Sequence, residues 1–362
     1  MRIALLTYST KPRGGVVHTL ALAEALARRG ADVTVWSLGR DGDGAFFRPV
    51  DPAVSVRIVP FAAIDGEDVG DRILRSIAVL RDAFTPDTYD VVHAQDCISA
   101  NAVGRCIRTI HHLDQFTTPA LAACHERAIV EPYARICVSQ AVADEVRDGW
   151  GYAPSVIPNG VDAARFEKAA NDVVGRRRWA RELGDYVLAV GGIEPRKGSI
   201  DLVDAYALLR RHRPDLQLVF AGGETLFDYR SYRTDFDTRC DELGVHPTIL
   251  GTVADNDLPA LVAQATALAF LSTKEGFGLA AMEALAAGVP VVARDLPVLR
   301  EVFGDTALFT STHQQMADAL AQPADPGQLD RGRALARAHS WDDAARAHLD
   351  FYRCALQRLR PS

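Results

Sequence analysis

Residues 2–37, RIALLTYSTKPRGGVVHTLALAEALARRGADVTVWS, decide the fold class of this 362-residue chain. The stretch opens with an apolar run of strand length at 2–7 and closes with a second run at 31–37, while segment 17–29 has helical spacing. Continuous apolar runs of this kind are typical of parallel strands that helices cover on both faces. We therefore expect a strand–helix–strand unit and an α/β fold.

The same alternation continues along the chain in two series. Further strand-like runs lie at 54–59, 91–93, 106–110, 135–138 and 155–157, and then at 186–190, 216–221, 248–250, 267–271 and 289–293. Helical stretches separate these runs, and the chain has about twice the usual length of one domain. The pattern predicts two Rossmann-like, doubly wound parallel-sheet domains.

The boundary between the two predicted domains falls in a charged segment, 162–184, which lacks a strand pattern. Linkers between domains have this character. We assign residues 1–162 to an N-terminal domain and residues 163–340 to a C-terminal domain. The last helix, 341–362, is expected to pack back on the N-terminal domain.

Composition and charge exclude several classes of partner. The formal net charge of −7 argues against a general nucleic-acid interface, which needs a basic surface. No apolar stretch is long enough to span a bilayer, so membrane contact is at most peripheral, and residues 71–84 are expected to form an ordinary surface helix rather than a lipid-binding one. The first apolar run is too short for a signal peptide, and the six cysteines form no CxxC pair. We expect a cytoplasmic protein, with at most peripheral contact to the inner membrane face.

Two glycines, Gly14 and Gly15, stand between the first strand and the first helix. A loop at this place can present backbone N–H groups to an anion at a helix N-terminus, although a simple turn would need the same residues. The GxGxxG fingerprint of dinucleotide-binding proteins is not found at this strand, and no GxxxxGK[ST] motif is present. A nicotinamide dehydrogenase and a P-loop nucleotidase are therefore disfavoured.

The second domain opens with the segment VGGIEPRKG at 190–198, where Arg196 and Lys197 follow a strand and precede a helix. Guanidinium, ammonium and the helix N-terminus together suit a diphosphate, and an exposed basic turn is the alternative.

The most specific segment is STKEGFGLAAMEALAAGVPVVA at 272–293. Glu275 lies at a strand end, where it can accept hydrogen bonds from sugar hydroxyls, and Glu283 lies in the following helix, where it can hold a ribose diol. The alternative is a solvated loop acid and a buried acid that pairs locally. The loop residues expected to face a phosphate with their backbone N–H groups are Phe277, Gly278 and Leu279, and Gly276 is expected to bind the donor in the same loop.

These segments resemble the retaining GT-B glycosyltransferases of the glycogen-synthase-like, sucrose-synthase-like and mannosyltransferase-like family, glycosyltransferase group 1. The likeness extends over essentially the whole chain. It rests on PRGGVVHTLALAEALARRGADVTV at 12–35, VIPNGVD at 156–162, VGGIEPRKG at 190–198 and EGFGLAAMEALAAGVPVVA at 275–293. The resemblance implies a GT-B fold whose N-terminal acceptor domain and C-terminal nucleotide-sugar donor domain face each other across a cleft.

The resemblance also implies a role for each matching residue. Gly14 and Gly15 would face the donor phosphates, while Arg196 and Lys197 would neutralise the diphosphate leaving group. The remaining contacts are Glu275 with the donor sugar, Glu283 with the ribose, the backbone of Gly251, Thr252 and Val253 with the base, and His111 with the transferred sugar, His112 and Asp114 being weaker candidates. One position departs from many relatives: Gly192 stands where they have an arginine, and we expect Arg196 to supply that charge.

The implied activity is transfer of a sugar from a nucleotide-sugar to a hydroxyl or other nucleophile, with retention of anomeric configuration. The resemblance favours a UDP-sugar and leaves a GDP-sugar open, and the acceptor can be a small molecule, a glycan or a lipid-linked compound. No metal or other cofactor is expected, because arginine and lysine already supply charge. A sugar-nucleotide epimerase, a sugar phosphorylase and a non-catalytic nucleotide-sugar-binding protein are the alternatives. Nothing in the sequence predicts the oligomeric state.

Overall fold

The computed structural model describes residues 1–40, 42–114, 116, 118–223 and 229–359. The chain divides into two compact units, Met1–Gly160 with Trp341–Ser362 (unit 1) and Val161–Ser340 (unit 2). Residues 360–362, the end of the predicted last helix, lie outside the described part. Each unit contains one parallel sheet covered by helices, so the two doubly wound Rossmann-like domains predicted from the sequence are confirmed.

The sheet of unit 1 has seven parallel strands in the order β3-β2-β1-β4-β5-β6-β7. In its centre, Leu5 lies opposite Val35 on one side and His93 on the other. The chain first builds outward from β1 to β3 and then continues from β4 on the other side of β1, so the order reverses between β1 and β4. The strands are β1 (Arg2–Leu6), β2 (Asp32–Arg40), β3 (Val54–Phe61), β4 (Val91–Ala94), β5 (Ile107–Ile110), β6 (Ala134–Cys137) and β7 (Ser155–Val156).

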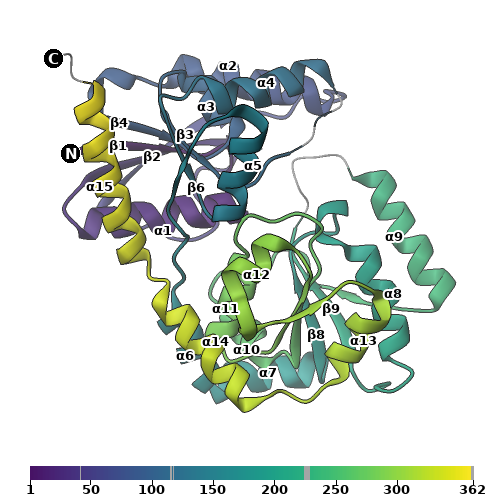
Figure 1. Cartoon of the computed structure of the whole chain (residues 1–362). Coiled ribbons are helices and arrows are strands. Elements are labelled where there is room, and N and C mark those ends of the chain that lie inside the picture. The colour runs from purple at the N-terminus through teal and green to yellow at the C-terminus, as the bar shows by residue number, and fades with distance from the viewer. Residues whose placement is uncertain (41, 115, 117, 224–228, 360–362) are drawn as a thin grey trace. The chain divides into compact units, whose positions relative to one another are not determined.

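Six helices and one 3-10 turn complete the described part of unit 1. They are α1 (Gly14–Arg28), α2 (Val69–Ala83), the turn η1 (Pro86–Thr88), α3 (Cys97–Val103), α4 (Pro119–Val130), α5 (Gln140–Trp150) and α15 (Trp341–Leu359). The last of these, α15, packs against α1 although more than 300 residues separate them in the chain. Figure 1 shows α15 in yellow on the same unit as the purple strands at the N-terminus.

Helix α15 is anchored to the sheet through a buried hydrogen-bond chain. The hydroxyl of Tyr352, which is fully buried, lies 2.7 Å from Nδ1 of His93 on β4. The other ring nitrogen of His93 lies 2.7 Å from the hydroxyl of Thr109 on β5. Three elements are therefore held together by groups that have no access to water.

Tyr352→Phe is expected to lower the free energy of unfolding by about 1–2 kcal/mol, because it removes a hydrogen bond and leaves a buried ring nitrogen without its partner. Urea titration followed by circular dichroism measures the change. Cys354→Ala, on an exposed position of the same helix, is the control and should leave the unfolding curve in place. Equal stability of Tyr352→Phe and wild type would show that the hydrogen bond does not anchor α15.

The sheet of unit 2 has six parallel strands in the order β10-β9-β8-β11-β12-β13, which reverses between β8 and β11. Leu188 in the centre lies opposite Val219 and Leu268. The last strand was not predicted, because three residues are too few to show a pattern. The strands are β8 (Tyr186–Val190), β9 (Gln217–Ala221), β10 (Thr248–Ile249), β11 (Ala267–Phe270), β12 (Val291–Arg294) and β13 (Leu308–Thr310).

The helices of unit 2 are α6 (Ala163–Asn171), α7 (Val173–Leu183), α8 (Ser199–Leu209), α9 (Arg230–Leu243), α10 (Leu258–Gln264), α11 (Leu279–Ala286), α12 (Pro297–Phe303), α13 (His313–Ala321) and α14 (Pro326–Ala338), with 3-10 turns at η2 (Pro195–Lys197) and η3 (Gly304–Thr306). The charged segment 162–184, in which we expected the linker and the first helix of the second domain, forms α6 and α7, which belong to unit 2 and bury Phe166 and Trp179 in it. On the sheet, α8, α9 and α13 share one apolar core with Val187, Leu218 and Phe220.

Helix α2 covers the segment in which the sequence left a lipid-binding surface open. Its apolar residues Ile73, Ile77 and Leu80 are buried. Arg75 is bound to Glu67 at 2.6 Å and lies over the ring of Phe61. These contacts turn the apolar stripe of α2 inward. Across the described ranges, no helix combines the length and the apolar character needed to cross a membrane.

Candidate functional site

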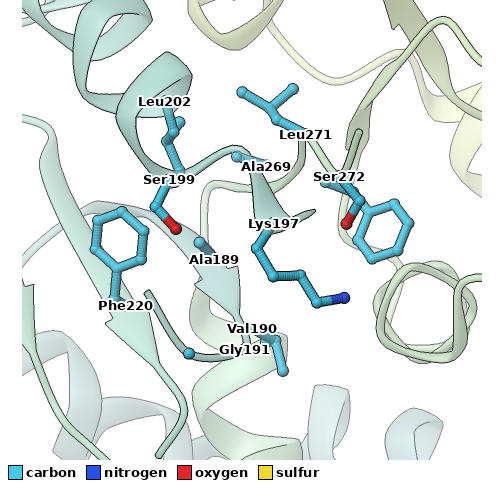
Figure 2. Close-up of a pocket in the computed structure, with 12 residues that line it drawn as sticks. Ala189, Val190, Gly191, Lys197, Ser199, Leu202, Phe220, Ala269, Leu271 and Ser272 are labelled. Carbon is cyan, nitrogen blue, oxygen red and sulfur yellow. The ribbon is translucent and has the colours of Figure 1, made fainter. Parts of the chain in front are cut away.

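A pocket of unit 2 lies at the carboxyl ends of β8 and β11, where the strand order reverses. Open α/β sheets bind ligands at such switch points. Its walls include Gly191 and Gly192 after β8 and Leu271 and Ser272 after β11. Lys197 extends across the pocket between the Gly191 loop and Ser272 (Figure 2).

Three donors converge on a single oxygen of Glu275 beside this pocket. The ammonium of Lys197 lies 2.6 Å from Oε1, the guanidinium of Arg196 lies 3.1 Å from it, and the hydroxyl of Ser272 donates to it at 2.8 Å. Within the described part of the chain no residue donates to the second oxygen, Oε2. The side chain of Glu275 is 11% exposed.

The charge of Glu275 is set by these neighbours. Burial alone would raise its pKa, but the positive charges of Lys197 and Arg196, with hydrogen bonds from Lys197 and Ser272, lower the pKa to about 2. The group is therefore a carboxylate at every pH at which the protein is expected to fold.

The backbone of the two loops that carry these groups is held directly together. The N–H of Thr273 donates to the carbonyl of Arg196 at 2.8 Å, and the guanidinium of Arg196 donates to the carbonyl of Lys274 at 3.3 Å. We name residues 194–198 the cation loop and residues 271–278 the carboxylate loop. Their mutual hydrogen bonds fix the position of both charges.

Gly222 is required by a close backbone approach next to the pocket. A Cβ atom on Gly222 would lie 2.1 Å from the carbonyl carbon of Gly191, and the N–H of Gly191 donates to Ala221 at 2.8 Å. Gly191 itself has φ +135, which side-chain-bearing residues rarely adopt. The loop after β8 can therefore pass over β9 only with glycine at these places.

Glu283 lies on α11. It is half-buried, and burial raises its pKa to about 7, an effect that Arg165 opposes and Asp255 and Asp162 reinforce. Arg165 and Asp255 form an ion pair at 2.9 Å. The second predicted carboxylate thus has its own polar surroundings on α6 and the loop after β10.

The other predicted donor-site residues of unit 2 lie on strand-end loops. Thr252 is exposed after β10, and a Cβ on Gly223 would meet its hydroxyl at 2.3 Å, so the loops after β9 and β10 touch. The ring of Phe277 is buried and lies 5.7 Å from that of His339, which leaves only its backbone for a ligand. The residues placed on these loops and at the start of α11 are Thr252, Val253, Gly276, Phe277, Gly278 and Leu279.

In unit 1 the structure brings together Gly14, Gly15 and His111. The two glycines form the first turn of α1, and a Cβ on Gly15 would lie 3.9 Å from the ring of His111. The buried ring of His18, one turn further along α1, packs edge-on against His111 with 4.7 Å between ring centres. Nδ1 of His18 lies 2.9 Å from Oδ1 of Asn159. His112 and Asp114 form a separate, more exposed pair at 3.2 Å.

Two residues with site contacts were not singled out from the sequence. Ser272 stands at the head of the segment that we quoted for Glu275, and its strand-end position was a usable signal. His18 lies four residues after Gly14, a spacing that places both on one face of a helix. In the ranges that the structure describes, no group of three or more His, Cys, Asp or Glu side chains could hold a metal ion.

Comparison with known proteins identifies both halves of the chain. Residues 177–325 match the family described as Glycosyl transferases group 1, and residues 12–165 match Glycosyltransferase Family 4. A D-inositol 3-phosphate glycosyltransferase of Mycolicibacterium paratuberculosis is 31% identical, with 98% of this chain and 91% of that protein covered.

Solved structures of similar fold cover nearly the whole chain. Sucrose-phosphate synthase from Thermosynechococcus elongatus has a TM-score of 0.79 at 20% identity, with 99% of each chain covered. Anabaena HepE in complex with UDP and glucose has a TM-score of 0.75 at 20% identity, covering 97% of this chain and 99% of the other. These likenesses show the fold, which is that of GT-B proteins. From the family matches and the 31% identical relative, the chain belongs to the group 1 glycosyltransferases.

Proposed function

We propose that this protein is a retaining glycosyltransferase that uses a nucleotide-sugar donor, with a UDP-sugar favoured and a GDP-sugar open. The observation that carries the proposal is the convergence of Arg196 and Lys197 on one oxygen of Glu275 beside the pocket of unit 2. UDP is placed first because the family resemblance favours it, and because Anabaena HepE, a protein of the same fold, was solved with UDP and glucose.

The chemistry of the donor suits these groups. When a nucleoside diphosphate leaves, negative charge develops on its β-phosphate while the anomeric carbon gains positive character. In the proposal, Arg196 and Lys197 stabilise the phosphate charge. Oε2 of Glu275 accepts a hydrogen bond from a donor-sugar hydroxyl, because Oε1 is already occupied by three donors.

The remaining assignments follow the family resemblance and stay predictions. Glu283 would hold the ribose, the backbone of Thr252 and Val253 would frame the base, and the N–H groups of Phe277, Gly278 and Leu279 would meet a phosphate. Gly14, Gly15 and His111 would contact the donor phosphates and the transferred sugar. Retention would proceed by same-face attack, with the leaving phosphate accepting the proton of the acceptor, and we propose that no metal takes part.

The first test is binding of UDP, GDP, ADP and TDP, each with and without its sugar, by calorimetry and thermal shift. We expect the wild type to select one nucleotide. Lys197→Ala should weaken that binding about tenfold or more, because a partly buried charge–phosphate contact is lost. Lys168→Ala, the same change on an exposed position of α6, is the control and should bind as the wild type does.

A second measurement separates glycosyl transfer from its alternatives. Turnover of the selected donor with candidate polyol and sugar acceptors, followed by NMR of the product, should show a new glycosidic bond with the anomeric configuration of the donor. Unchanged activity in EDTA would agree with a metal-free reaction. An epimerised donor, a sugar phosphate, or binding without turnover would each overturn the proposal, and inversion would overturn the retaining mechanism.

A further inference from the structure

The guanidinium of Arg294, at the carboxyl end of β12, joins segments that lie next to both loops of the donor site. Its Nε donates to the carbonyl of Leu271 at 2.9 Å, the first residue of the carboxylate loop. Its Nη2 donates to Asp201 in the first turn of α8, directly after the cation loop. The rigid, planar guanidinium therefore bridges Leu271 and Asp201, which are 70 residues apart in the chain.

Gly198 shows how closely these segments approach each other. This residue ends the cation loop with φ +64, and a Cβ on it would lie 2.3 Å from the carbonyl oxygen of Leu271 and 3.1 Å from Nη2 of Arg294. The guanidinium thus packs against the backbone at the junction of the two loops. Replacement of Arg294 would change the contacts at this junction directly, and the positions of Lys197 and Glu275 only through the two loops.

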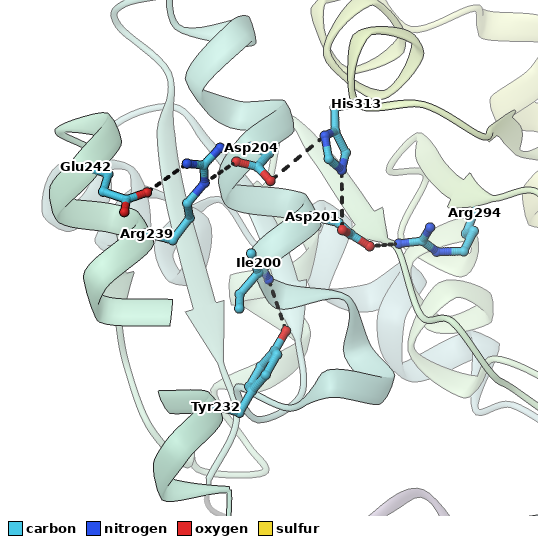
Figure 3. Close-up of polar contacts among 8 residues, drawn as sticks. All are labelled: Ile200, Asp201, Asp204, Tyr232, Arg239, Glu242, Arg294 and His313. Atoms are coloured by element: carbon cyan, nitrogen blue, oxygen red, sulfur yellow. Dashed lines mark hydrogen bonds and ion pairs between the residues drawn. The ribbon is translucent and has the colours of Figure 1, made fainter. Parts of the chain in front are cut away.

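Asp201 belongs to a cluster of charges around α8. In this cluster Arg239 is ion-paired to Asp204 as Arg294 is to Asp201, so Arg239 can serve as a matched control. Figure 3 shows Asp201 and Asp204 on α8 with His313 between them, Arg294 on the side of Asp201 and Arg239 on the side of Asp204. His313 lies 3.3 Å from Asp201 and 3.9 Å from Asp204. Arg239 donates to Asp204 at 2.7 Å and to Glu242 on α9 at 2.8 Å, so its contacts join α8 to α9.

We infer that Arg294 is a positioning residue for the donor site: with Asp201 it sets the separation of the cation loop and the carboxylate loop, and so the geometry of Lys197, Arg196 and Glu275. The inference rests on the proposed function. Arg294 is 19% exposed at its side chain and is not expected to touch the donor itself. A site of this kind tolerates displacements of only about 0.5 Å before binding and turnover fall.

The test compares Arg294→Met with Arg239→Met, each of which removes one arginine that is ion-paired to an aspartate of α8. Calorimetry with UDP, or with GDP where the wild type selects it, gives the dissociation constant, and thermal unfolding without nucleotide gives stability. We expect Arg294→Met to raise the dissociation constant about tenfold and to lower kcat as well. Arg239→Met should lose similar stability and bind nucleotide as the wild type does.

Two further variants keep the test decisive where Arg294→Met folds poorly. Arg294→Lys keeps the charge but cannot bridge Leu271 and Asp201 in a fork, so its affinity should lie between those of the wild type and Arg294→Met. Asp201→Asn should weaken binding less than Arg294→Met does. Equal dissociation constants for wild type, Arg294→Met and Arg294→Lys, or equal losses in Arg294→Met and Arg239→Met, would overturn the inference. Failure of the wild type to bind any nucleotide would instead overturn the proposed function, and the inference with it.

Discussion

Glu275→Gln is expected to lower kcat/KM for the nucleotide-sugar by about 100- to 1,000-fold, which corresponds to about 3–4 kcal/mol of transition-state stabilisation. The substitution keeps the size of the side chain but removes a charge that is present at all relevant pH values, because the pKa of Glu275 is about 2. The amide of glutamine has only one acceptor oxygen. Either its NH2 group faces Lys197, or the oxygen faces Lys197 and the NH2 group takes the place of the acceptor for the sugar hydroxyl.

The same variant should separate nucleotide binding from sugar transfer. In the wild type, Arg196 and Lys197 are both held by the carboxylate, whose negative charge also repels a diphosphate. Without that charge, the affinity for the free nucleoside diphosphate should stay equal or increase a few-fold, while turnover falls. Steady-state kinetics and calorimetry on one preparation measure both quantities.

Asp215→Asn is the matched control, since it removes one negative charge from an exposed ion pair before β9, at the opposite end of the strands. It should change neither turnover nor affinity. If Glu275→Gln retained full turnover, Glu275 would not contact the transferred sugar. A loss of nucleotide affinity as large as the loss of turnover would show that the carboxylate acts only by holding the cations in place.

Unit 1 is expected to lose stability steeply as the pH falls below about 6.5, because it buries several neutral histidines. Burial lowers the pKa of His348 on α15 to about 4, and it lowers the pKa values of His18, His93 and His111 well below their usual range. The neighbouring His348 and His18 lower the pKa of His93 further, and the positive charge of Arg108 lowers the pKa of His111 further.

The direction in which stability changes with pH follows from proton binding. Between pH 6.5 and the folded-state pKa, the unfolded chain binds protons that the folded protein excludes. The free energy of unfolding therefore rises with pH in this window, and above pH 6.5 the histidines cause no further loss of stability. For His348 alone the loss at pH 5 is about 2 kcal/mol, and the other three histidines add to it. Urea unfolding at several pH values between 7.5 and 5 measures the slope.

His348→Gln tests the assignment, because glutamine cannot take up a proton. The variant should be less stable than wild type at pH 7.5, since it disturbs the hydrogen bond from Nδ1 of His348 to the carbonyl of Ala344, 2.7 Å long. Its stability should nevertheless fall less steeply with pH, by up to one proton in the slope. A slope equal to that of the wild type would show that protonation of His348 does not contribute to the loss of stability at low pH.

The proximity of the residues proposed for the donor site could be predicted from the sequence, because parallel strands bring their carboxyl ends to one edge. Arg196 and Lys197 follow β8 and Glu275 follows β11, and the sheet places these two strands side by side. Once the runs 186–190 and 267–271 were assigned as strands of one sheet, the proximity of the two motifs was a consequence of topology. The roles given to the glycines of the first helix and to His111 stay predictions from the resemblance.

The pairing within the site could not be predicted. That Lys197, Arg196 and Ser272 all meet Oε1 of Glu275 depends on side-chain directions and loop geometry that strand periodicity does not carry. Arg294 lies 23 residues beyond Leu271 and resembles any other charged residue at a strand end until the fold places it there. The strand β13 is likewise defined by its neighbour β12 rather than by a pattern of its own.

By itself, then, the sequence determined the two α/β sheets and the strand ends that carry the chemistry, because apolar periodicity and glycine placement act locally along the chain. Only the tertiary structure decided how charges and buried rings are partnered. The four clustered histidines His18, His93, His111 and His348 come from α1, β4, the end of β5 and α15, and they meet because α15 returns to the N-terminal sheet. Contacts between residues so distant in sequence depend on packing, and packing is a property of the whole folded unit.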